Sequence, residues 1–580
     1  MTRFENPKNM SRRKFIALAG GAAAGLTALA AMGLSPEHGA CSPNIPEIDI
    51  DKMTSVENEA DVLVIGGGMA GLFAAVKAHD AGAKVMLVSK GRLGSSGQTP
   101  FAKGIFAYDA GSEKVSIDEF VDRVSHSALG TNNPVYTRQM AEHSLARVNE
   151  LQDWGFFDSP LYNDCFNRPL KERHIPVWER IVITHLIKDH GRIAGAAGFS
   201  LDEPTIHFCR SKSVILCTGA GGFKPNGFPI CDLTHDGTVM AYHIGAKVTG
   251  KEWNDGHPGQ AKNAAACFDG WHGMFERRPG ITSVGIRHDL GVDLNYRAYV
   301  AGNPVRMGGP EMERHTDIAG GPYRPAEFNR KRPPGGAHGP GMGPEKNGPP
   351  PGMRGTLVGG SSAGMSIHKS EGLVPINETC ESNIPGLYAA GDALGSYMAG
   401  AIYTQIGSSL AGSAVQGAVA AQAAAEYCKG VERPIISSDK MNEVREEILA
   451  PLKRESGYSP AWVTQTLQGI MIPNFIIYIK KEELLKAALA YVEELRDHHM
   501  PLLRAADLHE LRLACETANM ILSAEMKLRA SMMRKESRCS HFRLDYPEID
   551  TENWNVWINI YKGRNGEMRL EKQAFDHWPA

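Results

Sequence analysis

A glycine-rich turn near the start of the chain limits what this protein can fold into more than any other feature. Residues 61–65 form a short apolar run rich in β-branched side chains, which is typical of a buried parallel strand. The sequence Gly-Gly-Gly-Met-Ala-Gly follows at residues 66–71 and opens a helical pattern, and a second strand pattern comes at residues 84–88. A strand, a tight glycine turn, a helix and a second strand in this order predict a dinucleotide-binding fold.

Each glycine of the turn has its own physical role in such a fold. Gly66 permits the tight turn, Gly68 lets backbone N–H groups approach a pyrophosphate, and Gly71 lets the helix and the strand pack closely. Met69 and Ala70 lie at the start of the helix, where its partial positive charge favours a phosphate. We therefore predict a bound dinucleotide.

The size and charge of the chain narrow the class of partner. Its 580 residues, 42% of them hydrophobic, predict roughly two to four domains. The formal net charge of −3 argues against nucleic acid or an anionic membrane surface as the main partner. We expect a small-molecule substrate instead.

The N-terminus has the pattern of a twin-arginine export signal. Arg12 and Arg13 precede a weakly hydrophobic stretch of glycine and alanine at residues 15–34. A membrane anchor is the alternative, but a stable span needs a more strongly apolar segment than one with four glycines. Cleavage after Gly33 or after Ala40 fits the pattern. The sequence therefore predicts a periplasmic or other extracytoplasmic protein that folds around its cofactor before export.

None of the ten cysteines belongs to a C-x-x-C or C-x-x-C-H motif. The sequence therefore predicts no metal site, and it encodes no iron–sulfur or c-type haem motif. If electrons enter or leave one at a time, another protein has to carry them. We expect an external carrier such as a cytochrome or an iron–sulfur protein.

Further glycine motifs follow along the chain. Residues 217–222 read Cys-Thr-Gly-Ala-Gly-Gly at the end of a strand pattern, residues 384–392 read Ile-Pro-Gly-Leu-Tyr-Ala-Ala-Gly-Asp, and residues 407–410 open a small-residue helix. Near the end, residues 534–547 read R-x-E-S-R-x-x-H-x-R-x-D-Y-P. Together these motifs resemble the flavoprotein subunits of the succinate dehydrogenase and fumarate reductase superfamily, which includes L-aspartate oxidase and adenylylsulfate reductase.

The resemblance implies an α/β fold with a Rossmann-like FAD-binding domain, an inserted α+β capping domain and a C-terminal helical domain. The expected divisions are a twin-arginine signal peptide at residues 1–40, the first part of the FAD-binding domain at 58–248, a capping or substrate domain at 249–365, the returning part of the FAD-binding domain at 366–432, and the helical domain with its tail at 433–580. Residues 333–355 form a Pro/Gly tract, which predicts a loop or flap in the capping domain.

The resemblance also implies FAD as the cofactor. The acid that usually follows the second strand is replaced by Ser-Lys, which this superfamily carries there. The implied cofactor-binding residues are Gly66, Gly68, Met69, Ala70, Gly71, Ser89, Lys90, Gly97, Gly104, Thr218, Gly219, Asp236, Gly391, Asp392, Ser408, Ser409 and Leu410. Relatives with covalent FAD attach it to a histidine after the second strand. Gly97 stands at that position, so we expect noncovalent FAD.

Family chemistry needs an acid or base beside the flavin and cationic groups that clamp a carboxylate. His257 matches one family histidine and is the candidate acid or base, with an ordinary loop histidine as the alternative. The second histidine position holds Ser361 or Ser362. Tyr403 stands near the family's arginine and faces the flavin, unless it is an ordinary half-buried tyrosine. Candidates for the proton-shuttle arginine, which has no recognisable motif here, are Arg277, Arg278, Arg287 and Arg324.

These residues predict an exported FAD-dependent oxidoreductase that transfers hydride between flavin N5 and a small organic substrate other than fumarate. One alternative is an adenylylsulfate-reductase-like flavoprotein subunit, which the tail motif and the missing flavin-linking histidine favour. Another is an FAD-bearing electron-transfer subunit without its own substrate. In the tail, we expect His541 and Arg543 to pair with Asp545 and Glu548 rather than to take part in catalysis.

Overall fold

The computed structural model of the protein describes most of the chain after residue 49. The described residues are 50–224, 230, 232–254, 276–284, 365–366, 371–395, 397–401, 404–405, 407–472, 474–477 and 479–578. The predicted signal peptide at residues 1–40 lies outside them, as does the Pro/Gly tract at residues 333–355.

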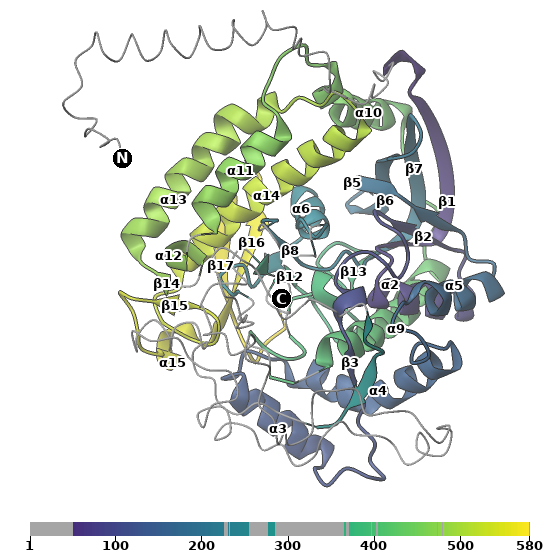
Figure 1. The fold of residues 1–580 in the computed structure, drawn as a ribbon, viewed down its shortest axis with the longest axis vertical. Coiled ribbons are helices and arrows are strands. Elements are labelled where there is room, and N and C mark those ends of the chain that lie inside the picture. The colour runs from purple at the N-terminus through teal and green to yellow at the C-terminus, as the bar shows by residue number, and fades with distance from the viewer. Residues whose placement is uncertain are drawn as a thin grey trace, which may run out of the picture. The chain divides into compact units, whose positions relative to one another are not determined.

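One mixed sheet carries the glycine turn (Figure 1). Its seven strands are β1 (Thr54–Ile65), β2 (Val85–Ser89), β4 (Val177–Glu179), β5 (Ile181–Asp189), β6 (Arg192–Ser200), β7 (Thr205–Leu216) and β13 (Leu387–Ala389). They lie in the order β4-β2-β1-β7-β6-β5, with β13 paired to β7. β1 is parallel to both β2 and β7, and its residues Val62, Leu63 and Val64 are fully buried. The two strands predicted around the turn are therefore present.

An antiparallel pair of strands extends the sheet beyond β7. β5 and β6 pair from Ile181↔Ser200 to Asp189↔Arg192, and β6 pairs with β7 in the same antiparallel sense. This extension leaves the parallel strands β1, β2 and β7 side by side, with their carboxyl ends at one edge of the sheet.

Two helices of small residues pack together beside the glycine turn. α2 (Met69–Asp80) follows the turn directly, and α9 (Ser408–Lys429) packs against it (Figure 1). A Cβ on Gly417 of α9 would lie 2.4 Å from the carbonyl oxygen of Ala70. The two backbones therefore approach more closely than larger residues would permit.

Three α-helices lie between β2 and β4 in the chain. They are α3 (Ile117–Ser127), α4 (Pro134–Asp153) and α5 (Asn163–Glu172). Ser116 caps α3 by accepting a hydrogen bond from the backbone N–H of Glu119. Asn133 caps α4 in the same way, from the N–H of Val135. Side-chain caps satisfy N–H groups that have no partner inside the helix, so these starts are defined locally.

Short strands attach the predicted capping region to the rest. β3 (Gly104–Phe106) pairs in parallel with β10 (Gly280–Thr282), and β8 (Gly221–Gly222) pairs with β11 (Met365–Ser366). The remaining capping residues lie outside the described part of the chain.

The predicted C-terminal helices are present. They are α10 (Ser438–Lys453), α11 (Pro460–Met471), α12 (Asn474–Ile477), α13 (Glu482–Glu494) and α14 (Leu508–Met533). α11, α13 and α14 share a second apolar core that includes Leu467, Leu485 and Ile521. None of the described helices combines the length and the apolar character that a membrane span requires.

The last residues form a hairpin that has no counterpart among the strands predicted from the sequence. After α15 (Thr551–Trp554), β16 (Val556–Lys562) and β17 (Met568–Ala574) pair with each other. β16 also pairs with β9 (Val248–Thr249), which in turn pairs with β12 (Gly372–Leu373). The hairpin thus joins the end of the chain to the FAD-binding part of the fold.

The tail motif at residues 534–547 forms a buried network of charged side chains. The Arg534 guanidinium lies 3.0 Å from a carboxylate oxygen of Glu252 and 2.8 Å from one of Glu536. Arg538 also contacts Glu536, at 2.8 Å. These side chains are essentially inaccessible to solvent, so each guanidinium requires its carboxylate partner.

The second half of the motif agrees with the prediction at Arg543 but not at His541. Arg543 pairs with Asp545 at 2.7 Å, as predicted. His541 instead places its Nδ1 2.8 Å from the Nζ atom of Lys480. Lys480 belongs to β14 (Ile479–Lys480), which pairs with β15 (Phe542–Arg543), and this strand pairing sets the partner of the histidine.

His541 should make the stability of the protein depend on pH. Burial, together with the nearby Lys480 and Arg534, holds the pKa of His541 well below its ordinary value, so the folded protein keeps the ring neutral. The unfolded chain protonates its histidines below about pH 6.5, and the folded state therefore loses stability as the pH falls below that value. We expect the melting temperature to fall between about pH 7 and pH 5, and to fall less in the His541→Asn variant.

Replacement of an exposed histidine is the matched control. His498 has a side chain that is 68% exposed, and the His498→Gln variant should keep the wild-type pH dependence. Some dependence should remain in His541→Asn, because burial also lowers the pKa of His235. An unchanged pH profile in His541→Asn would contradict the expectation.

Candidate cofactor and active site

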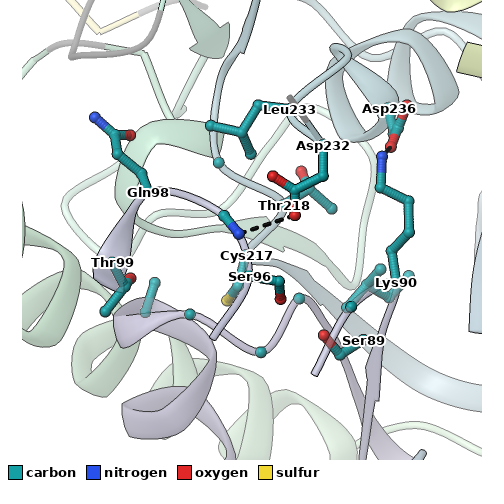
Figure 2. Close-up of a pocket in the computed structure, with 18 of the residues that line it drawn as sticks. Ser89, Lys90, Ser96, Gln98, Thr99, Cys217, Thr218, Asp232, Leu233 and Asp236 are labelled. Atoms are coloured by element: carbon teal, nitrogen blue, oxygen red, sulfur yellow. Dashed lines mark hydrogen bonds and ion pairs between the residues drawn. The ribbon is translucent and has the colours of Figure 1, made fainter. Parts of the chain in front are cut away.

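A long cleft opens where β1, β2 and β7 end (Figure 2). The walls consist of the glycine turn, the end of β2, the loop at residues 96–99, the segments at 217–219 and 232–236, and the turn at 390–392.

Close backbone contacts give the glycine turn its shape. Gly66 has a φ of +117°, and a Cβ there would lie 2.1 Å from the carbonyl oxygen of Cys217. A Cβ on Gly71 would lie 1.8 Å from the carbonyl oxygen of Gly66. The roles predicted for these two glycines are confirmed. Thr99 accepts a hydrogen bond from the backbone N–H of Met69 at 3.1 Å and so orders the first turn of α2.

One end of the cleft is built from charged side chains around the end of β2. Lys90 directs its Nζ atom to Asp236 Oδ2 at 2.7 Å, to Glu516 Oε1 at 2.9 Å and to Thr234 Oγ1 at 3.2 Å. Burial opposes the charge on Lys90, but the two carboxylates raise its pKa above the ordinary value. Lys90 and Asp236 lie together at one side of the cleft in Figure 2. This is the end where dinucleotide-binding folds place the adenosine ribose.

The loop after β2 is held from the opposite wall. The backbone N–H of Gly97 donates to Asp232 Oδ2 at 2.8 Å. Gly97 has a φ of +70°, and a Cβ there would meet no atom within 4 Å, so the position has room but favours glycine. It lines the cleft where the resemblance places the flavin-linking histidine of covalent relatives.

A second cavity continues from the cleft at its other end. Both spaces are lined by Asp392 and Ser413, so they form one track. The second cavity reaches Ser408 and Ser409, the first residues of α9. The start of α9 carries the partial positive charge of a helix N-terminus, which favours electron-rich or anionic groups.

Two buried hydroxyl groups along this track suit a cofactor. Among the described residues, Thr218 Oγ1 and Ser409 Oγ have no hydrogen-bond partner. Buried hydroxyl groups are normally paired, so each is available to a ligand that lies along the track. FAD would supply the missing partners, and the lining residues therefore fit this cofactor.

Most of the predicted cofactor residues lie along the track. Those in the cleft are Gly66, Gly68, Met69, Ala70, Ser89, Lys90, Gly97, Thr218, Gly219, Asp236 and Asp392. Those in the second cavity are Gly391, Asp392, Ser408 and Ser409. Gly71, Gly104 and Leu410 line neither space: Gly71 packs against the turn, Gly104 begins β3, and Leu410 is buried in α9.

The predicted catalytic residues are not brought together by the described structure. The residues that lie outside the described part of the chain are His257, Tyr403, Ser361, Ser362, Arg287 and Arg324. Arg277 and Arg278 are exposed just before β10 and line neither cavity. They remain candidates only.

The structure adds polar residues that sequence reasoning missed. Thr99 contacts the start of α2, Asp232 holds the loop after β2, and Ser413 joins the two cavities. Asp232 comes four residues before Asp236, and this pair of acids was the one local signal that could have drawn attention to it. Thr99 and Ser413 have no such signal, because only tertiary packing brings them to the cleft.

Comparison with known proteins agrees with the resemblance seen in the sequence. Residues 61–168 match the FAD binding domain model, and residues 464–578 match the model of the fumarate reductase flavoprotein C-terminal region. The chain therefore carries two signature regions of the succinate dehydrogenase and fumarate reductase flavoproteins. It is an FAD-dependent oxidoreductase, and its fold class is the predicted one.

Two relatives of this flavoprotein match it along nearly their whole length. An uncharacterized FAD-dependent oxidoreductase of Methanocaldococcus jannaschii is 26% identical over 89% of this chain and 98% of its own length. A CoM/CoB fumarate reductase chain of Methanothermobacter marburgensis is also 26% identical, over 86% and 97%. A solved structure of the E. coli quinol fumarate reductase, with a TM-score of 0.68 and 19% identity, covers 90% of this chain and 98% of its own and shares the fold.

Replacing Gly71 should release the flavin. In Gly71→Ala, the added methyl group would lie 1.8 Å from the carbonyl oxygen of Gly66, so the turn has to open. Gly469 of α11 is the matched control, because a Cβ there meets nothing within 4 Å. Gly469→Ala should be neutral or stabilising by about 0.5–1 kcal/mol. We expect purified Gly71→Ala to lose most of its flavin and Gly469→Ala to keep it.

Acid precipitation measures the flavin in these proteins. All of the wild-type flavin should appear in the supernatant, since Gly97 offers no imidazole for a covalent link. Flavin in the pellet would contradict noncovalent binding. Full flavin content in Gly71→Ala would contradict the role given to the close contact.

Proposed function

We propose that this flavoprotein is an exported oxidoreductase that transfers hydride between FAD and a small organic substrate other than fumarate, with an external protein as electron carrier. Bound FAD would supply the hydride exchange. The protein would orient the cofactor along the track from Lys90 to Ser409 and expose its reactive end at the start of α9.

The sequence positions of the dicarboxylate clamp are the observation that carries the substrate class. Ser361 or Ser362 stands where dicarboxylate-specific relatives carry a histidine, and Tyr403 stands near the position of their arginine. Without these cationic groups, a second carboxylate of the substrate lacks a charged partner. This supports a neutral or mono-anionic substrate.

The expected substrate preference can be measured with reduced viologen as electron donor. Each lost charge-assisted contact to a carboxylate weakens binding by about tenfold or more. We expect fumarate to be a poor acceptor beside neutral or mono-anionic enoates. Turnover of fumarate about a hundredfold faster than any of these would overturn the proposal, and Arg277→Gln and Arg278→Gln would then test whether these arginines complete the clamp.

Assays of flavin reduction and oxidation test the two alternatives, an adenylylsulfate-reductase-like flavoprotein subunit and an electron-transfer subunit without its own substrate. Reduction of the flavin by sulfite in the presence of adenosine monophosphate would favour the adenylylsulfate-reductase-like reading. Flavin oxidation by a protein carrier alone would favour an electron-transfer subunit. The names of relatives point to different electron sources, quinol in the E. coli protein and CoM/CoB in the Methanothermobacter protein, so the donor has to be tested rather than carried over.

The proposal that the protein is exported rests on Arg12 and Arg13, which precede a weakly hydrophobic segment. Replacing both with lysine should leave the protein, with its FAD, in the cytoplasm of the producing cell. Fractionation followed by immunodetection measures this. A double variant that still reached the far side of the membrane would contradict the twin-arginine route.

A further inference from the structure

The C-terminal helix α14 reaches into the wall of the FAD cleft. Glu516 of α14 places one carboxylate oxygen 2.9 Å from Lys90 Nζ, and its other oxygen accepts a hydrogen bond from Lys224. One turn further along, Asn519 donates to Asp236 Oδ1 at 2.9 Å. The two residues lie on the same face of the helix because they are three positions apart. Figure 1 shows α14 beside α6 (Asp236–His243), the helix that begins with Asp236.

Lys90 has no donor left for a ligand. An ammonium group has three N–H donors, and those of Lys90 face Asp236, Glu516 and Thr234. The ammonium group of Lys90 therefore contacts neighbouring side chains, although the residue lines the cleft. Lys90 fixes the position of the Asp236 carboxylate, and Glu516 fixes the position of Lys90.

Asp236 is the acid that lines the adenosine end of the cleft. Dinucleotide-binding folds place an acid after the second strand to bind ribose hydroxyl groups, and here β2 ends in Ser89 instead. Asp236 reaches the same end of the cleft from α6. Burial would raise the pKa of Asp236, but Lys90 and the hydrogen bonds from Asn519 and Thr234 hold it below the ordinary value. The carboxylate is thus ionised and ready to accept hydrogen bonds.

Glu516 brings a carboxylate from α14 to the cations of this wall. Lys90 pairs with Asp236 and with Glu516, and Lys224 pairs with Glu516. The Glu516 side chain is 1% exposed, so water cannot replace it. Without the Glu516 charge, Lys90 and Lys224 would each lose a carboxylate partner, and an ion pair of low solvent exposure that loses one partner is destabilised.

We propose that Glu516 is a positioning residue for FAD: through Lys90 it fixes Asp236 for the ribose of the cofactor, so that tight FAD binding requires α14 to be docked. The inference rests on FAD binding and not on the substrate. By linkage, bound FAD should in turn stabilise the docking of α14.

A matched pair of variants tests this. Glu525, on the same helix, is 3% exposed and also pairs with two cations, Arg496 and Arg529, but it lies away from the cleft. We would compare Glu516→Gln with Glu525→Gln by the fluorescence of FAD released on dilution of the holoprotein. We expect the dissociation constant to rise about tenfold or more in Glu516→Gln and to stay within about twofold of wild type in Glu525→Gln.

Two further measurements separate positioning from a loss of stability. Asn519→Ala removes the contact that α14 itself makes to Asp236 without leaving a buried charge unpaired, and it should weaken FAD binding by several-fold. In the wild type, FAD should slow hydrogen exchange in α14. Equal FAD loss in Glu516→Gln and Glu525→Gln would overturn the proposal. A wild-type affinity for FAD in Glu516→Gln would also overturn it, as would hydrogen-exchange rates in α14 that are the same with and without FAD. None of these assays needs a substrate, so their failure is distinct from that of the proposed function.

Discussion

The close approach of three strand ends is the constraint on which the rest of this structure depends. β1, β2 and β7 stay hydrogen-bonded up to the turn, where Gly66 donates its N–H to Val88 and Cys217 donates its N–H to Ile65, at 2.8 and 2.7 Å. A side chain at Gly66 would collide with Cys217, so the strand ends can meet only around a glycine. One cofactor can therefore touch the glycine turn, the end of β2 and the segment after β7 together.

Buried charges connect the C-terminal region to this cleft. Lys527 of α14 donates to the carbonyl oxygens of Lys251 and Trp253, both at 2.7 Å, and Arg534 pairs with Glu252. Residues 251–254 lie directly before the undescribed segment that contains His257. Burying so many charges costs free energy unless every group is paired, so this arrangement specifies one geometry rather than adding stability. The helical region thus supports the FAD-binding part at two places, the adenosine end of the cleft and the segment that leads into the capping region.

Local patterns carried a large part of the prediction. The strands around the turn, the roles of Gly66 and Gly71 and the helices α9 to α14 follow from periodicity and from backbone sterics, which act over a few residues. The partner of His541 did not follow. A charge-rich run suggested Asp545 and Glu548, but the pairing of β14 with β15 brings in Lys480 from 61 positions away. The hairpin β16–β17 was missed for a similar reason, since its pairing with β9 joins segments that share no local pattern.

The sequence by itself determined that this protein binds a dinucleotide cofactor and which family it resembles, because a glycine turn between two buried strands permits little else. It also placed Ser89 and Lys90 at the end of β2, but it could not say what the lysine contacts. Only the tertiary structure decided that the ammonium group of Lys90 contacts Asp236 and Glu516. An ammonium group pairs with whichever carboxylates the fold brings within reach. Here they are Asp236 of α6 and Glu516 of α14, which lie 146 and 426 positions after Lys90 in the chain.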